Sequence, residues 1–405
     1  MERPAIEGGE PLRREPLFIL PKFDDDEIRA VVEVLKSGRL TSHVGNKVRE
    51  FEDKFSSYLG VKHSIATFNG TTALHTSLRA LGIGPGDEVI TTPFTFVATA
   101  TSILHQNAIP IFADIDRETF NLDPSSVEER ITEHTRAILV VHLCGHPAEM
   151  DELISIARER GLALVEDCAQ ALGAEYKGRK VGTLGNVAAF SFYLSKNITT
   201  GEGGMVATDE EEVAEKARLI IDHGQRERYS YELLGYNYRM TELQAVIGLI
   251  QLSKLDEMNK RREEIAKIYM EEFSGEEALI LPEVKSYVKH VWHVFDVLVD
   301  LNKVSVSRDR IVEAVRKENV YVSVAYPRPL YLEPIFRDMV GHGRGCPWSC
   351  PLYRGKVSYF KGLCPNAEWV SERVITLSTQ PSLSDEEVMD IAKALRKVVS
   401  FYRRH

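Results

Sequence analysis

Phe190-Ser191-Phe192-Tyr193-Leu194-Ser195-Lys196 begins as an apolar, aromatic run and ends at a single lysine. A loop rich in Thr and Gly follows, and then a second apolar run, so the pattern predicts a strand, a tight loop and another strand. A lysine at the end of a buried strand is poorly solvated, which favours its neutral amine. Because a neutral amine can attack a carbonyl to form a Schiff base, Lys196 is the candidate nucleophile. The alternative is a lysine that caps a strand at the surface.

The composition describes a globular protein with a sizeable core. The chain has 405 residues, of which 43% are hydrophobic and 27% are charged, so we expect two or three domains. A formal net charge of -10 argues against a protein that binds nucleic acid or an anionic membrane. No apolar run approaches the roughly 18 residues that span a bilayer. Five cysteines fit a reducing compartment, so we expect a cytoplasmic protein.

The first half of the chain alternates short apolar runs with helical patterns. Strands are expected at 63–68, 88–92, 109–113, 137–142 and 162–165. This alternation predicts an α/β fold with a mainly parallel sheet and helices on both of its faces. Ligands bind such sheets at the carboxyl ends of strands, and Thr71, Phe96, Asp167 and Lys196 all lie at or just beyond a predicted strand end.

A helical pattern from Thr241 to Phe273 is longer than most helices and can link two domains. We place the boundary near Leu255, which gives a large domain, 1–255, and a smaller C-terminal domain, 256–405. The smaller domain alternates strand-like runs at 291–299 and 320–325 with helical patterns, which suggests an α+β fold.

A helix is expected to begin at Asn69-Gly70-Thr71-Thr72, directly after a strand. The free N-H groups and the positive dipole at a helix N-terminus suit a phosphate. The alternative is an ordinary threonine N-cap. At the end of another strand, Phe96 is either a core residue or a ring that stacks on a ligand.

Together these residues resemble the site of a pyridoxal-phosphate enzyme, which must hold an aldehyde on a lysine, a cationic ring nitrogen, a flat ring and a phosphate. Asp167 would pair with the pyridinium nitrogen, and Lys196 would move the substrate proton. Gly70, Thr71 and Ser191 would receive the phosphate.

The chain resembles the sugar aminotransferases of the DegT/DnrJ/StrS type, within fold type I of pyridoxal-phosphate enzymes. The similarity covers nearly the whole chain and rests on several motifs in the same order: Gly38-x-x-Thr41, Asn69-Gly70-Thr71-Thr72-Ala73-Leu74, Pro93-Phe94-Thr95-Phe96-Val97-Ala98-Thr99, Val165-Glu166-Asp167-Cys168-Ala169-Gln170, Ser191 to Lys196, Gly201-Glu202-Gly203-Gly204, Gly235-Tyr236-Asn237-Tyr238-Arg239-Met240 and Leu377-Ser378.

The resemblance implies a seven-stranded sheet and a pyridoxal 5'-phosphate aminotransferase that moves an amino group from glutamate or glutamine to a nucleotide-linked keto sugar. It implies Lys196 as the Schiff-base lysine and Asp167 on the ring nitrogen. The other implied cofactor contacts are Gly70, Thr71, Thr72, Phe96, Gln170 and Ser191. It also implies a homodimer in which Asn237 reaches the cofactor phosphate of the neighbouring subunit.

The substrate side departs from the family pattern. Many members have one histidine directly before a Tyr-Pro pair and another a few residues later. This chain has Ala325 before Tyr326-Pro327, and Tyr331 at the later position. A cyclitol aminotransferase therefore stays an alternative, as does a cofactor-binding regulator without catalysis. Lys196 disfavours a dehydratase of the same fold. The candidate substrate contacts are Thr41, Tyr326, Arg328 and Tyr331.

A separate cluster combines His342, Cys346, Cys350 and Cys364, and each of the three cysteines precedes a proline. One His and three Cys can bind zinc, and Cys346 and Cys350 can form a bridge. Packing of a rigid loop is the third interpretation and the one we favour, so no metal ligand is included in the predicted site.

Overall fold

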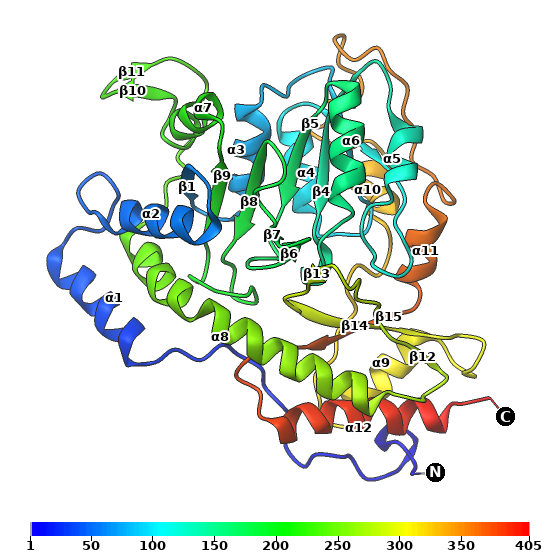
Figure 1. The fold of residues 1–405 in the computed structure, drawn as a ribbon. Helices are drawn as coiled ribbons and strands as arrows, with labels where there is room; N and C mark the ends of the chain where they lie inside the picture. Colours follow the sequence, from blue (N-terminus) through cyan, green and yellow to red (C-terminus); the bar gives the residue numbers. More distant parts are fainter. Residues whose placement is uncertain (1, 405) are drawn as a thin grey trace.

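A seven-stranded sheet forms the centre of the larger part of the molecule (Figure 1). The computed structural model describes residues 2–404. Only β9 runs antiparallel to its neighbours, which confirms the predicted mainly parallel sheet. In spatial order the strands are β1 (His63–Thr67), β9 (Gly204–Thr208), β8 (Val187–Ser191), β5 (Ala163–Asp167), β4 (Thr135–Val141), β2 (Glu88–Thr91) and β3 (Ile109–Phe112).

Helices cover both faces of this sheet because its strands are apolar on both sides. Leu139 and Val165 pack with the helices of one face, whereas Ile138 and Leu164 pack with those of the other. This opposite placement of adjacent residues follows from the two-residue period of a strand. The first face carries α3 (Gly70–Ala80), α4 (Ala98–His105) and α7 (Glu211–Ile221), and the second carries α5 (Pro124–Arg130) and α6 (Met150–Arg160).

The long predicted helix is α8 (Glu242–Glu272), which begins at a capping box formed by Thr241 and Gln244. Its N-terminal half packs on α1 (Asp25–Ser37) and α2 (Lys47–Leu59). Its C-terminal half contributes Ile265 and Tyr269 to a separate core. We propose that the domain boundary lies within this helix near Leu255, the last fully buried residue that α8 contributes to the core beneath the sheet.

The C-terminal core lies between a small antiparallel sheet and two helices. Its elements are β12 (Leu279–Ile280), β14 (Val294–Val299), β15 (Val374–Ser378), α9 (Arg308–Arg316) and α12 (Asp385–Phe401). This arrangement confirms the smaller α+β part. The N-terminal segment packs here too: Leu17 joins the core, the amides of Ala5 and Leu12 donate to Glu318, and Lys397 donates to the carbonyl of Glu10.

The strand expected at 320–325 does not form. Ser323 makes a single bridge to Thr376, and the backbone of Tyr326 then enters the left-handed region with a φ of 49°. The remaining elements are short: β6 (Glu175–Tyr176), β7 (Arg179–Lys180), β13 (Val288–Lys289), β10 (Gln225–Glu227), β11 (Ser230–Tyr231), α10 (Pro334–Arg337) and α11 (Pro365–Ser371), with one-turn helices η1 (Ala5–Glu7), η2 (Leu143–Gly145) and η3 (Leu330–Leu332). None of the helices described within residues 2–404 has the length and apolarity to cross a membrane.

Arg262, on α8, joins the two parts of the molecule from within. Its side chain is 1% exposed, and its guanidinium donates to the carbonyls of Lys196 (3.2 Å) and His293 (3.1 Å). It also donates to the hydroxyl of Thr379 (3.0 Å) and the side-chain oxygen of Gln380 (3.1 Å). All of these acceptors are neutral, and burial lowers the pKa of Arg262 to about 9.

Candidate active site

A cavity of about 530 Å³ lies at the carboxyl ends of the central strands. The structure brings eight of the predicted residues together in its wall, from helix starts, strand ends and the C-terminal domain. They are Gly70, Thr71, Phe96, Asp167, Gln170, Ser191, Lys196 and Tyr326. Another cavity, of about 550 Å³, lies between α2 and α7 and is lined by charged side chains including Arg49, Arg218 and Arg239. Lys196 and Asp167 distinguish the first cavity as the candidate for chemistry.

Lys196 lies in the turn after β8, where its amide donates to the carbonyl of Tyr193 (2.9 Å) and its carbonyl accepts from Arg262. Burial of the amine lowers the pKa of Lys196 to about 8, against the opposing attraction of Asp167 and Cys144. Near pH 7 the neutral fraction of Lys196 is therefore larger than that of an ordinary lysine. The structure thus places the amine of Lys196 in the poorly solvated environment that the sequence suggested.

Asp167 ends β5 and is 4% exposed. The hydroxyl of Thr99 donates to its Oδ2 (2.8 Å), and the amide of Ala169 donates to its Oδ1 (3.1 Å). Burial raises the pKa of this carboxyl, while the two hydrogen bonds and the charge of Lys196 oppose the rise. A cationic ligand beside Asp167 would therefore relieve the cost of a buried negative charge.

Gln170 is fixed at both ends of its amide. Its Oε1 accepts from the amide of Cys144 (2.8 Å), and its Nε2 donates to the hydroxyl of Tyr326 (2.9 Å). Cys144 in turn donates its thiol to Asp296 of β14 (3.0 Å). The chain of contacts links the sheet to the C-terminal domain and sets the position of Tyr326 in the cavity wall.

The start of α3 forms a cradle with the end of β8. The side chain of Asn69 caps the helix by accepting from the amide of Thr72 (2.9 Å). A Cβ at Gly70 would lie 2.6 Å from the Cβ of Ser191, so only glycine allows the two backbones to approach this closely. The first amides of a helix have no intrahelical acceptor, and here they lie beside the hydroxyls of Thr71 and Ser191. This donor set fits a phosphate.

Several predicted residues do not line the cavity. Thr72 uses its hydroxyl in the cap of α3, donating to the carbonyl of Asn69 (2.8 Å). Thr41 is exposed and pairs with Thr241, and exposed Arg328 forms an ion pair with Glu333 (3.2 Å). Asn237 is also exposed, outside the cavity of its own chain.

Tyr331 is not a substrate contact in this structure. It is fully buried in an aromatic core, where its ring lies 6.0 Å from that of Phe112, and its hydroxyl donates to Glu368 (2.6 Å). Tyr331 was expected near the substrate because it stands where many family members have a histidine.

The cysteines near the C-terminus do not gather around one point. Cys364 is buried with its thiol 3.9 Å from the carbonyl of Phe112, whereas His342 bonds through Nε2 to the carbonyl of Leu104 (2.8 Å). Cys346 and Cys350 are both free thiols. The contacts of these residues agree with packing of a rigid loop.

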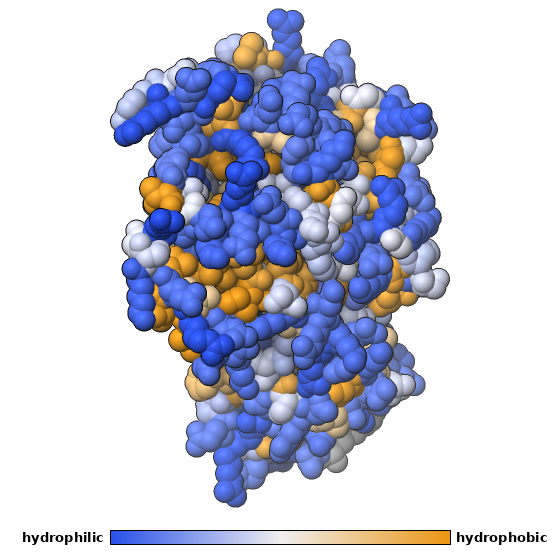
Figure 2. All heavy atoms as spheres, turned by 60° about the vertical axis from the view of Figure 1, so that its left-hand side comes forward, coloured by the Kyte–Doolittle hydropathy of each residue, from blue (hydrophilic) through white to orange (hydrophobic). Residues whose placement is uncertain are grey.

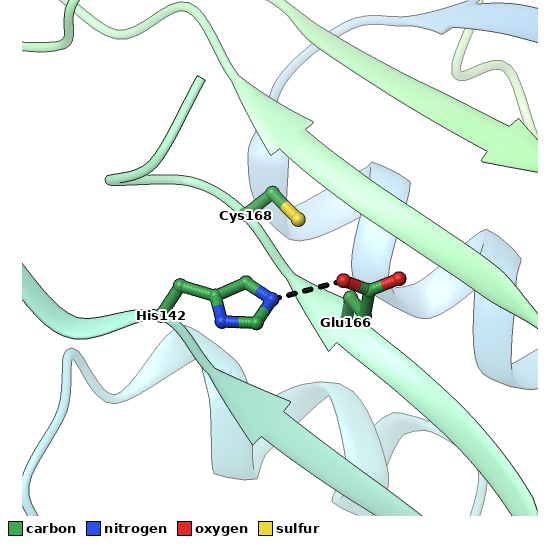
Figure 3. A group of neighbouring side chains, drawn as sticks. All are labelled: His142, Glu166 and Cys168. Carbon is green, nitrogen blue, oxygen red and sulfur yellow. Dashed lines mark hydrogen bonds and ion pairs between the residues drawn. The ribbon is translucent and has the colours of Figure 1, made fainter. Parts of the chain in front are cut away.

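His142, Glu166 and Cys168 do gather (Figure 3), and they include ligand types that bind metals. The amides of Gly182, Leu184 and Gly185 donate to Glu166, each at 2.7 Å, and Nε2 of His142 lies 3.0 Å from its Oε2. Nδ1 of His142 accepts from the amide of Ala148. The carboxylate of Glu166 and the imidazole of His142 already have hydrogen-bond partners in the protein. The cluster therefore fits a structural role, in which it stabilises the strand that carries Asp167, better than a metal site.

Sequence reasoning missed three residues that shape the cavity. Thr99 binds Asp167, Arg262 binds the carbonyl of Lys196, and His293 lines the cavity wall. Thr99 ends the motif from Pro93 to Thr99, and no pattern marked its role. Arg262 lies in the charged run Lys260-Arg261-Arg262-Glu263-Glu264, which is typical of an exposed helix face, and His293 lies in an apolar pattern that also describes an ordinary core position.

Comparison with known proteins agrees with this geometry. The model of the DegT/DnrJ/EryC1/StrS aminotransferase family matches residues 21–349. GDP-perosamine synthase of Caulobacter vibrioides is 42% identical over 296 residues, covering 72% of this chain and 79% of that protein. The pleiotropic regulatory protein of Geobacillus stearothermophilus is 37% identical over 380 residues, covering 93% and 94% of the two chains.

Among solved structures, DesV of S. venezuelae, crystallised in complex with a ketimine intermediate, superposes with a TM-score of 0.83. It is 35% identical in sequence, and the match covers 92% of this chain and 94% of that one. The similarity extends over both the sheet and the C-terminal part, so it includes the walls of the cavity.

The lowered pKa of Lys196 predicts selective reactivity. In protein freed of small ligands, labelling of Lys196 by trinitrobenzenesulfonate should rise with pH around a midpoint of about 8, because only the neutral amine attacks. Peptide mass spectrometry can follow exposed Lys177 as an internal control; its hydrogen bond to Asp151 raises its pKa, so its labelling should rise at higher pH. A midpoint for Lys196 at the ordinary lysine value, near 10.5, would contradict the expected environment.

Proposed function

The chain belongs to the DegT/DnrJ/EryC1/StrS aminotransferase family and is therefore a transaminase, and we propose that it uses pyridoxal 5'-phosphate to move an amino group from glutamate or glutamine to a nucleotide-linked keto sugar. The observation that carries this proposal is the meeting of Lys196, Asp167 and the start of α3 around one cavity. These three supply a poorly solvated amine, a buried carboxylate and a phosphate cradle, which are the partners that this cofactor requires.

When bound, pyridoxal 5'-phosphate supplies an aldehyde carbon that receives the amino group and a ring that accepts the electrons released at the substrate carbon. Asp167 holds a proton on the ring nitrogen, and Thr99 keeps the carboxylate oriented. Phe96, at 61% exposed, offers its ring face at the mouth of the cavity. Gly70, Thr71 and Ser191 hold the phosphate.

Lys196 has two tasks in this proposal. Its amine would hold the cofactor through the aldehyde, and as a free amine it would carry the proton to and from the substrate carbon. The second task requires a neutral amine, and the pKa of about 8 leaves a useful fraction of Lys196 neutral near pH 7. Tyr326 and Gln170 close the same wall and orient the ligand.

The nucleotide-linked acceptor is proposed from similarity to GDP-perosamine synthase. Arg328 is exposed at 58% of its side chain and holds only a surface ion pair with Glu333, so it is free to exchange that partner for a pyrophosphate. Tyr326 is the candidate contact to the sugar itself, because it alone of the four predicted substrate residues lines the cavity.

A turnover screen tests the proposed function. Purified protein with pyridoxal phosphate should aminate at least one keto-sugar nucleotide with glutamate or glutamine as donor, and borohydride should fix the cofactor on the peptide that contains Lys196. Turnover of a free keto-cyclitol alone would reject the nucleotide-linked acceptor. Cofactor attachment without turnover of any acceptor or donor would favour a regulator.

Replacement of Asp167 separates cofactor attachment from catalysis. Asp167→Ala should lower kcat/KM by on the order of a hundredfold or more, because an unprotonated ring is a poor electron acceptor. Asp167→Asn should be nearly as impaired. Borohydride should still fix the cofactor on Lys196 in both variants, which controls for folding and binding. Near-normal turnover of either variant would contradict the role of Asp167.

We further propose that two copies of the chain share their active sites. Asn237 lies on an exposed loop, and its amide could donate to a phosphate held by a partner subunit. Figure 2, in which the left-hand side of Figure 1 comes forward, shows a band of apolar side chains across the middle of that face. On α1, which lies at the same side in Figure 1, Ile28, Val32 and Leu35 are 56%, 40% and 53% exposed. An exposed apolar helix face of this kind supports an interface.

Complementation between inactive variants tests the shared site. Asn237→Ala should weaken binding of pyridoxal phosphate, and mixing it with Lys196→Ala should restore part of the activity, because a mixed dimer contains one intact site. Mixing Asp167→Ala with Lys196→Ala is the matched control and should restore nothing, since both residues serve their own subunit. An active monomer with full cofactor occupancy would overturn the shared site.

A further inference from the structure

His293 lines the cavity, and its imidazole ring forms no hydrogen bond with the rest of the described chain. It lies directly before β14, on the C-terminal domain, and is 8% exposed. Among residues 2–404 its Nδ1 is fully buried and has no hydrogen-bond partner, whereas Nε2, which forms no hydrogen bond either, is not fully buried. Because Nε2 reaches the surface of the cavity wall and has no partner in the protein, it is available to a ligand in the cavity.

The backbone of His293 is held firmly. Its amide donates to the carbonyl of Cys144 (2.8 Å), and its carbonyl accepts from Arg262 (3.1 Å) and from the hydroxyl of Thr379 (3.0 Å). The same guanidinium of Arg262 binds the carbonyl of Lys196. His293 and the reactive lysine are therefore fixed relative to one another through a single side chain.

The surroundings of the ring decide which nitrogen carries the proton. A buried N-H without an acceptor is less well tolerated than a lone pair without a donor, so the enclosed Nδ1 keeps its lone pair and Nε2 carries the hydrogen. Burial and the nearby charges of Lys196 and Arg262 hold the pKa of His293 well below 6.5. The ring is thus a neutral donor near pH 7.

We propose that His293 donates a hydrogen bond through Nε2 to the oxygen that each substrate carries on the carbon next to its reacting carbon. This rests on the proposed function, whose two substrates share that feature: an amino acid has a carboxylate beside its amine-bearing carbon, and a keto sugar has a hydroxyl beside its ketone. One donor fixed relative to Lys196 can therefore orient both substrates in turn.

Titration of the cofactor absorbance tests this contact. His293→Phe should raise the half-saturating concentration of L-glutamate by on the order of ten- to a hundredfold, as expected for loss of a hydrogen bond to a charged group. Binding of 4-aminobutanoate, which has no carboxylate next to its amine, should change little. His293→Gln, which keeps an amide donor, should recover most of the affinity.

His290 provides a matched control, because it stacks on Trp292 at 3.9 Å, accepts from the amide of Trp292 and does not line the cavity. His290→Phe should leave the L-glutamate titration unchanged. An unchanged titration in His293→Phe would overturn the contact. An equal loss for both amines would also overturn it, because it would indicate a structural effect.

Nitrogen-15 NMR of the histidine rings gives a readout without cofactor or turnover. In cofactor-free protein, the resonance that disappears in His293→Gln should show a neutral ring protonated at Nε2 from pH 6 to 9. A cationic ring, or one protonated at Nδ1, would overturn the proposal. A wild-type protein whose absorbance does not respond to glutamate or glutamine would overturn the proposed donors instead, so the two failures are distinguishable.

Discussion

The guanidinium of Arg262 is the contact on which the active-site geometry depends. Burying a cation without a carboxylate partner has a large desolvation free energy. Hydrogen bonds to neutral oxygens of three separate segments offset it here. Those segments carry Lys196, His293 and the turn after β15. Helix α8, within which we propose the domain boundary, thus also joins the two parts of the molecule at the cavity.

Neighbouring residues of β5 show how one strand serves both stability and chemistry. Glu166 and Asp167 point to opposite sides of the sheet, as adjacent strand residues must. Glu166 accepts hydrogen bonds from three backbone amides and is paired with His142, so it has little capacity left for a ligand (Figure 3). Asp167 accepts only from Thr99 and Ala169, which leaves it able to meet a cation.

The parallel sheet and most of the cavity could be predicted because they rest on local patterns. Apolar runs indicated the strands; Asp167 ends β5 and Gly70 begins α3, while Lys196 lies in the turn beyond the end of β8. Tyr331 could not be placed from the sequence, because its burial depends on Phe112 and Glu368, which are distant in the chain. His293 could not be placed either, since a histidine in an apolar pattern looks the same whether it faces a core or a cavity. Arg262 has charged neighbours, Arg261 and Glu263, which are typical of an exposed helix face and hid its burial. The strand expected at 320–325 was wrong because this segment pairs with β15 at Ser323 alone.

Both chain ends lie at the C-terminal domain, where Ala5 and Leu12 bind Glu318, and Lys397 binds both Glu318 and Glu10 (Figure 1). During synthesis the first twenty residues leave the ribosome long before α12 exists, so they have no finished surface to dock on. The large sheet can assemble while the chain is still growing, but the smaller core needs both Leu17 and the residues of α12 before it can close. The segment around Leu17 therefore docks late in folding, although it precedes the whole sheet in the chain.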